Sequence, residues 1–140
     1  MANEAVLIYE TEVTIQMTVA DGTGIEKGAL LKLTDPFTAS AASTDHDLVA
    51  GIAGAEKIAS NGQTKLKVFR AGIFKVLLSG SATVGDPMTI EGDTTNSFKT
   101  AVNLTRAQLS GSRTWGIALE TGTNGETILM ELRPMADGGA

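Results

Sequence analysis

Hydrophobic and polar positions alternate along much of this 140-residue chain, in the period-two pattern of half-buried strands. The longest alternation covers residues 5–19, where Val13, Ile15 and Met17 share one face and polar side chains occupy the other. Shorter strands are predicted between turn signals at 28–33, 48–55, 64–70, 72–78, 87–91, 115–120 and 127–133. Only residues 100–110 have helical spacing, for one or two turns. The pattern therefore predicts an all-β fold.

Three signals occur twice along the chain, in the same order. A strand that begins at a glycine comes first, then a Gly-Ile-Ala run, then an Asn-Gly turn. The first set lies at residues 28–33, 51–53 and 61–62, and the second at 85–90, 116–118 and 124–125. A repeat of this kind predicts two pseudo-duplicated lobes, at about 25–78 and 80–133. Chance recurrence of turn signals in a glycine-rich β protein is the alternative.

The length fits one domain, which we expect to span residues 21–135 and to end in a frayed tail at 136–140. The N-terminal segment, residues 1–20, lies outside the repeat. It could be the first strand of its own sheet, or an arm that pairs with a sheet edge of another chain. In the second case Val13, Ile15 and Met17 would form the buried face of the arm.

Composition and charge exclude several functional classes. The net charge is −5, and the densest basic cluster is only Lys65, Lys67 and Arg70, so nucleic-acid binding is not expected. No apolar run reaches the roughly 20 residues that a membrane span needs. Residues 1–4 lack the basic start of a secretory signal, which favours synthesis in a cytoplasm.

The search for chemistry finds no catalytic or metal-binding pattern. His46 is the only histidine and there is no cysteine, so neither a typical transition-metal site nor a cofactor is predicted. Asp45 and Asp47 flank His46, but adjacent residues of an extended chain point to opposite faces. Asp86 and Glu91 are carboxylates that folding could pair, although turn roles are simpler. We therefore predict that the protein is not an enzyme.

Aromatic residues are scarce, and Trp115 lies inside an apolar strand. An exposed Trp115 or Tyr9 could stack on a sugar, so a carbohydrate-binding or adhesion module is the alternative function. The favoured interpretation places four apolar residues in the core or at an oligomer interface: Ile73, Phe74, Val76 and Trp115.

The order of these motifs resembles the capsid decoration (cement) proteins of tailed bacteriophages, the family of the lambda head decoration protein. The resemblance rests on Gly28-x-x-Leu31, on residues 48–53 and on the block 65–76. The second half, from Gly85-Asp86-Pro87-Met88 through residues 115–118 to Leu132, is similar to the cement proteins that repeat this module.

The resemblance implies a small β-tulip or β-clip barrel that forms a homotrimer on the outer surface of a virion head. Its partner would be the major capsid protein, to which the N-terminal segment would add a strand. The implied function is structural, namely stabilisation of the head without a cofactor.

Overall fold

A computed structural model of the chain describes residues 4–10, 14–43, 47–91, 96–101 and 114–135. Every element in these ranges is a strand, which confirms the all-β prediction. The helical turns expected at 100–110 fall largely outside the described residues, as does the tail at 136–140. The strands are β1 (Val6–Tyr9), β2 (Ile15–Thr18), β3 (Leu30–Asp35), β4 (Thr38–Ala41), β5 (Val49–Ala53), β6 (Lys65–Phe69), β7 (Gly72–Leu78), β8 (Pro87–Ile90), β9 (Ser97–Thr100), β10 (Thr114–Ala118) and β11 (Thr127–Met135).

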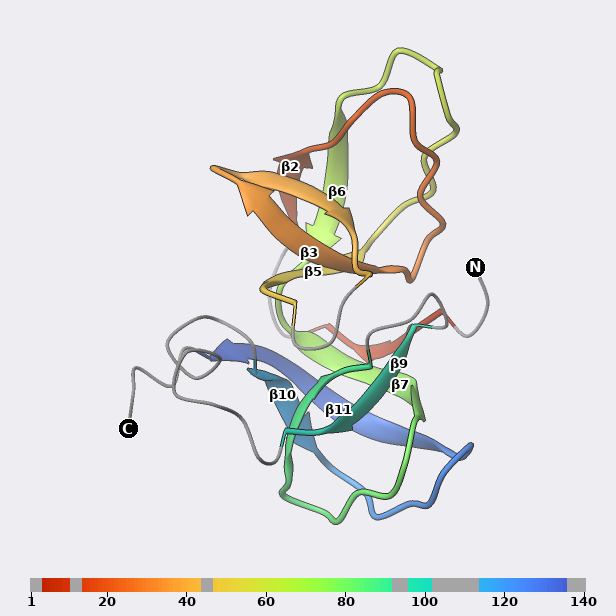
Figure 1. The fold of residues 1–140 in the computed structure, drawn as a ribbon, viewed down its shortest axis with the longest axis vertical. Helices are drawn as coiled ribbons and strands as arrows, with labels where there is room; N and C mark the ends of the chain where they lie inside the picture. Colours follow the sequence, from red (N-terminus) through yellow and green to blue (C-terminus); the bar gives the residue numbers. More distant parts are fainter. Residues whose placement is uncertain (1–3, 11–13, 44–46, 92–95, 102–113, 136–140) are drawn as a thin grey trace.

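The strands form two closed five-stranded barrels, stacked along the long axis of the molecule (Figure 1). Barrel 1 has the strand order β2-β4-β3-β5-β6 and barrel 2 the order β7-β9-β8-β10-β11. In each barrel the first strand pairs in parallel with the third and antiparallel with the fifth. The two pseudo-duplicated lobes predicted from the sequence are therefore two barrels of the same topology.

Strand register is also the same in the two barrels. Leu30 pairs with Ile52 and Ile52 with Phe69 in barrel 1, as Pro87 pairs with Ile117 and Ile117 with Glu131 in barrel 2. The first strands agree as well: Ile15 pairs with Val68 in barrel 1, and at the same place in barrel 2 Phe74 pairs with Met130. Residues that occupy the same place in the two strand registers are therefore equivalents.

The repeated glycines have structural reasons. Gly28 and Gly85 both adopt positive φ, at 88° and 92°, and each donates its N–H to the alanine that ends a Gly-Ile-Ala run, at 2.8 Å. In the runs themselves, a Cβ on Gly51 would lie 2.1 Å from the Phe69 carbonyl oxygen. On Gly116 it would lie 1.9 Å from that of Glu131. Adjacent backbones thus approach too closely for any side chain, which ties the motif to the barrel geometry.

Barrel 1 has its own interior, but barrel 2 shares its core with the outer face of barrel 1. Met17, Leu31 and Val68 lie in the interior of barrel 1. Leu30 and Phe69, which point outward from barrel 1, join the larger cluster that fills barrel 2. One wall of barrel 1 therefore closes one end of barrel 2.

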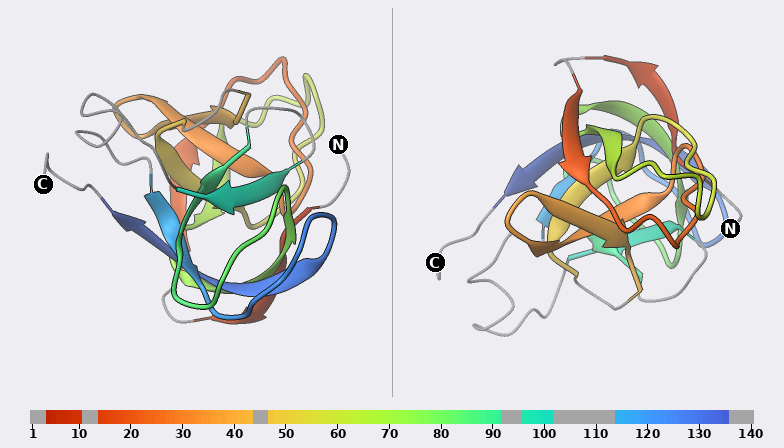
Figure 2. Two further views of the ribbon diagram at one scale, coloured as in Figure 1. Left: turned by 60° about the horizontal axis from the view of Figure 1, so that its bottom comes forward. Right: turned by 90° about the horizontal axis from the view of Figure 1, so that it is seen from above.

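Of the two alternatives for the N-terminal region, the structure has strands paired within the chain. β1 pairs antiparallel with β7 of barrel 2, and Figure 2 shows it along the outside of that barrel. β2 instead closes barrel 1 by pairing with β6 and β4, so this part of residues 1–20 is an intramolecular strand. The repeat boundary is also corrected, because residues 72–78 form the first strand of barrel 2 and not the end of the first lobe.

Candidate interaction surfaces

The candidate catalytic groups have structural roles where the structure describes them. The Asp47 carboxylate accepts the Ser43 backbone N–H at 2.9 Å, and Asp86 accepts that of Thr83 at 2.9 Å, which is a turn role. Glu91 forms an ion pair with Lys99 at 3.6 Å. Asp45 and His46 lie outside the described residues. Across the described ranges, three or more metal-ligating side chains nowhere gather into a possible metal site. Nor does any helix in these ranges have the length and apolar character of a membrane span.

Two of the three residues predicted for a capsid-binding arm lie in barrel 1. Met17 is 2% exposed in its interior, and Ile15 packs against the same cluster. Val13 lies outside the described residues. The period-two pattern correctly indicated a strand with one apolar face. That face is buried by the chain's own β3 and β6, so Met17 is not available to a partner, and this assignment is corrected.

Three of the four residues predicted for the core or an oligomer interface belong to the core of barrel 2. Phe74, Val76 and Trp115 are at most 1% exposed, and Ile73 is half-buried on the outer face. The Trp115 ring packs edge-on against Phe98, and its Nε1–H donates to the Asp47 carbonyl at 3.1 Å. Trp115 thus joins the two barrels, and its burial removes it as a sugar-stacking platform.

The first candidate surface is the β1 edge, which we define as Val6, Ile8 and Tyr9. These side chains are 56%, 41% and 65% exposed, an unusual density of exposed apolar area for a four-residue strand. Within the described residues β1 pairs with β7 alone, so its second edge has no strand partner there. A hollow of 530 Å³, lined in part by Leu7 and Lys67, lies between β1 and barrel 1. The β1 edge can therefore accept a further strand.

The second candidate surface is the open end of barrel 1, a hollow of 260 Å³ lined by Ile15, Met17, Leu33, Phe37 and Arg70. Phe37 is 61% exposed at the tip of the β3–β4 hairpin, and its φ is 53°. A left-handed conformation costs a residue with a Cβ about 1–2 kcal/mol. An exposed aromatic residue held at such a cost suggests a contact outside the chain.

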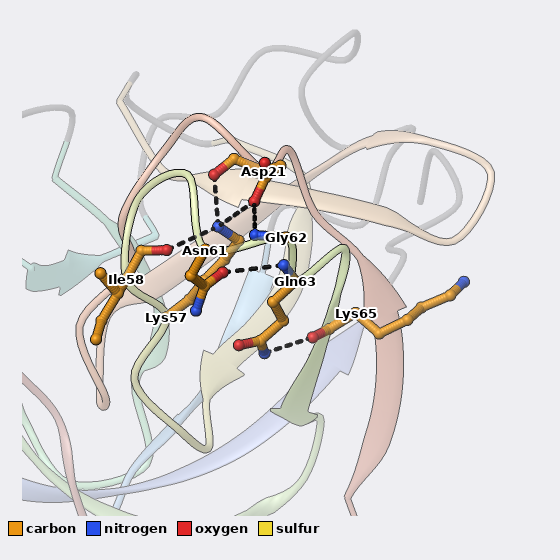
Figure 3. A network of polar contacts seen from close by, with 7 residues as sticks. All are labelled: Asp21, Lys57, Ile58, Asn61, Gly62, Gln63 and Lys65. Atoms are coloured by element: carbon orange, nitrogen blue, oxygen red, sulfur yellow. Dashed lines mark hydrogen bonds and ion pairs between the residues drawn. The ribbon is translucent and has the colours of Figure 1, made fainter.

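The third candidate surface is the tip of barrel 1, where two loops are joined by Lys57 (Figure 3). The Lys57 side chain is fully buried. Its ammonium group donates to the carbonyls of Asp21 at 2.7 Å and Ile58 at 3.2 Å, and lies 3.8 Å from the Asp21 carboxylate. The same carboxylate accepts the Gly62 N–H at 2.7 Å. Because these contacts satisfy the buried charge, Lys57 fixes the loops, and Ile58 remains 68% exposed beside a hollow of 370 Å³.

Sequence reasoning missed the β1 edge, Phe37 and Lys57. Pro36-Phe37 between two short strands did signal a tight turn, because proline favours the position before a left-handed residue. Nothing local marks Lys57 as buried, since its partner Asp21 lies on a loop that is distant in sequence.

No family model matches this chain, and no curated protein matches it. Among solved structures, it is similar to the N base of the head fiber protein gp8.5 of bacteriophage phi29. The TM-score is 0.52, the sequence identity is 13%, and the match covers 88% of this chain and 97% of that one. At this identity the likeness shows a common fold. It does not single out the decoration-protein family that the sequence resembles.

Proposed function

We propose that this protein is a structural component of a phage-type virion that binds the outer surface of the head as a homotrimer and stabilises it. One observation carries the proposal: nearly the whole chain shares its fold with the base of a phage head fiber. The motif order that resembles decoration proteins supports the same location from independent evidence.

Stabilisation would act by mass action. A protein that binds the assembled shell and not its separate subunits lowers the free energy of the assembled state. A trimer that contacts three capsid subunits binds much more tightly than one protomer, since the second and third contacts are intramolecular. A modest contact per protomer is therefore sufficient, with the major capsid protein as the partner.

We place the grip on the head at the β1 edge. Backbone pairing with an extended capsid segment would satisfy the free edge of β1, and Val6 and Ile8 would supply the apolar contact. This keeps the predicted N-terminal contact but moves it from Ile15 and Met17 to the preceding strand. The tip loops of barrel 1 would then point away from that contact (Figure 1).

The test is co-sedimentation with undecorated heads assembled from the major capsid protein of the same genome. The variant Val6→Ser/Ile8→Ser should stay folded, because neither side chain belongs to a buried core, and should lose most head binding. The matched control, Ile58→Ser/Val84→Ser, removes two exposed side chains at loop tips and should bind like the wild type. A wild-type protein that does not bind these heads would refute the function. Equal binding by both variants would refute only the grip.

A further inference from the structure

We propose that copies of this protein bind one another head to tail, with the outer wall of barrel 2 of one copy seated on the open end of barrel 1 of the next. This would repeat, between molecules, the contact by which barrel 1 closes barrel 2 within the chain. The inference refines the trimer of the proposed function by naming the surface that joins its copies. It is argued from the common register of the two barrels.

In the contact within the chain, the outer wall of barrel 1 covers one end of barrel 2. The wall is the outer cross-strand row of barrel 1, formed by Leu30, Ile52 and Phe69, all buried. The end of barrel 2 that it covers is formed by Phe74, Ile90, Asn96 and Leu132, each at most 5% exposed. Two contacts join them: the Phe69 ring packs edge-on against Phe74 at 5.7 Å, and the Leu30 N–H donates to Asn96 Oδ1 at 3.2 Å.

Both equivalent surfaces are left uncovered by the described residues of a single chain. The open end of barrel 1 consists of the equivalents of Phe74, Ile90, Asn96 and Leu132, which are Ile15, Leu33, Phe37 and Arg70. The outer row of barrel 2 is formed by Pro87, Ile117 and Glu131, the equivalents of Leu30, Ile52 and Phe69. Pro87 is exposed and the other two are half-buried. The chain thus carries one occupied and one unoccupied example of the same contact.

The occupied and the unoccupied contact differ at a first pair of positions, and the two differences compensate each other. Asn96 and Phe37 each precede the third strand of their barrel, β9 and β4, and both have positive φ, at 55° and 53°. Asn96 accepts the Leu30 N–H. The equivalent of Leu30 is Pro87, which has no N–H to donate, and Phe37 has no side-chain acceptor. A hydrogen bond within the chain is thus replaced by an apolar pair across the proposed contact.

The second pair is complementary in charge. Phe69 of the barrel 1 wall and Leu132 of the barrel 2 end belong to the same buried apolar cluster. Their equivalents are Glu131 on the wall and Arg70 on the open end. In the single chain the Glu131 carboxylate lies 3.1 Å from Arg133, and Arg70 donates to the Ala50 carbonyl at 3.3 Å. Both remain partly exposed, so a wall seated on the next copy's end would bring a carboxylate to a guanidinium, a strong bidentate pairing.

A wall on an end is a heterologous contact, because the two surfaces differ. Such contacts close into rings when the rotation between copies permits and otherwise extend as filaments. Three copies would place six barrels in one ring, each closed by the wall of its neighbour. The proposed trimer is the closed form of this contact.

The experiment is light scattering of the purified full-length protein over a wide concentration range, without heads. Glu131→Arg and Arg70→Glu should each raise the dissociation constant of self-association by about tenfold or more, and the double variant should restore it. In the double variant, residue 131 is an arginine that Arg133 repels. A pair formed with Arg133 within the chain therefore cannot explain the restored association. Glu56→Arg and Lys67→Glu make the same charge changes at exposed positions away from the contact and should behave like the wild type.

A second variant separates association from folding. Phe37→Asn places at this left-handed position the residue that barrel 2 has there, so it should raise the melting temperature of the monomer while weakening association about tenfold or more. A wild-type protein that remains monomeric, single variants that associate normally, or a double variant that is not restored would each overturn the proposal. These outcomes would not refute head binding by the β1 edge, which is a different surface; the loss of the trimer would remove only its gain in avidity.

Discussion

A glycine series tests whether close backbone approach, and not turn conformation, fixes the Gly-Ile-Ala motif. In Gly116→Ala the new Cβ would lie 1.9 Å from the Glu131 carbonyl oxygen, and one of the two must retreat by about 1.5 Å to reach the 3.4 Å of ordinary contact. Neither atom belongs to a flexible side chain, so the β10–β11 pairing must yield. Overpacking costs about 1–3 kcal/mol, and two weakened ladder hydrogen bonds would add about 2 kcal/mol.

We therefore expect Gly116→Ala to lower the free energy of unfolding by about 3–5 kcal/mol. The melting temperature of a chain of this length would fall by roughly 10–20 °C. Two matched variants isolate the cause. Gly125→Ala has positive φ (87°) but open space around its Cβ, so only the left-handed cost of about 1–2 kcal/mol applies. Gly22→Ala has neither problem and should change stability by less than about 1 kcal/mol.

The assay is urea unfolding followed by circular dichroism, with the fluorescence of the single Trp115 reporting on the core of barrel 2. From the most to the least stable, the expected order of the variants is Gly22→Ala, Gly125→Ala and Gly116→Ala. If Gly116→Ala unfolds at the same urea concentration as Gly125→Ala, the close approach is not what the motif encodes.

Three further predictions concern other contacts. Lys57→Met should cost about 2–4 kcal/mol and speed hydrogen exchange mainly in the tip loops of barrel 1, because it leaves two carbonyls without their donor; uniform exchange would contradict a local role. Trp115→Phe should cost about 2–4 kcal/mol through the lost bond to the Asp47 carbonyl and the cavity, measured by urea unfolding, and an unchanged midpoint would refute it. Hydrogen bonds from the Thr123 hydroxyl and N–H hold the pKa of Glu126 below its ordinary value of 4.5, so its stabilisation is present above that pH and is lost as the pH falls through the lowered pKa. Glu126→Gln should remove this part of the acid dependence, as seen in melting temperatures across that range.

The repeated topology could be predicted from the sequence because its signals correspond to backbone requirements. Gly28 and Gly85 supply the same positive φ, and Gly51 and Gly116 the same close approach. Such requirements are local and cannot be met by other residues at low cost, so they appear at equivalent places in both copies. The order of turns therefore indicated the order of strands.

The partners of each strand could not be predicted in the same way. Alternation in residues 15–18 indicates one apolar face whether the strand belongs to barrel 1 or pairs with another chain, because burial looks the same in either case. Residues 72–78 follow residues 64–70 directly and gave no sign that the chain passes there to a second barrel. Trp115 was ambiguous for the same reason, since core and interface have similar composition.

If copies associate as we propose, the differences between the contact within the chain and the contact between molecules follow from where each one forms. The contact within the chain is held at high effective concentration, because only Arg70 and Ala71 separate β6 from β7, and it is never exposed in the folded protein. It can therefore be apolar, with Phe69 on the barrel 2 end. A contact between molecules must remain soluble while it is unoccupied, and an exposed phenylalanine-and-leucine pair would favour aggregation. A carboxylate at Glu131 and a guanidinium at Arg70 meet that requirement, since each is hydrated or locally paired when free and attracted to the other on assembly. The pattern of substitution between the two barrels is thus what a duplicated module would need if one copy of its contact became covalently linked and the other remained available for assembly.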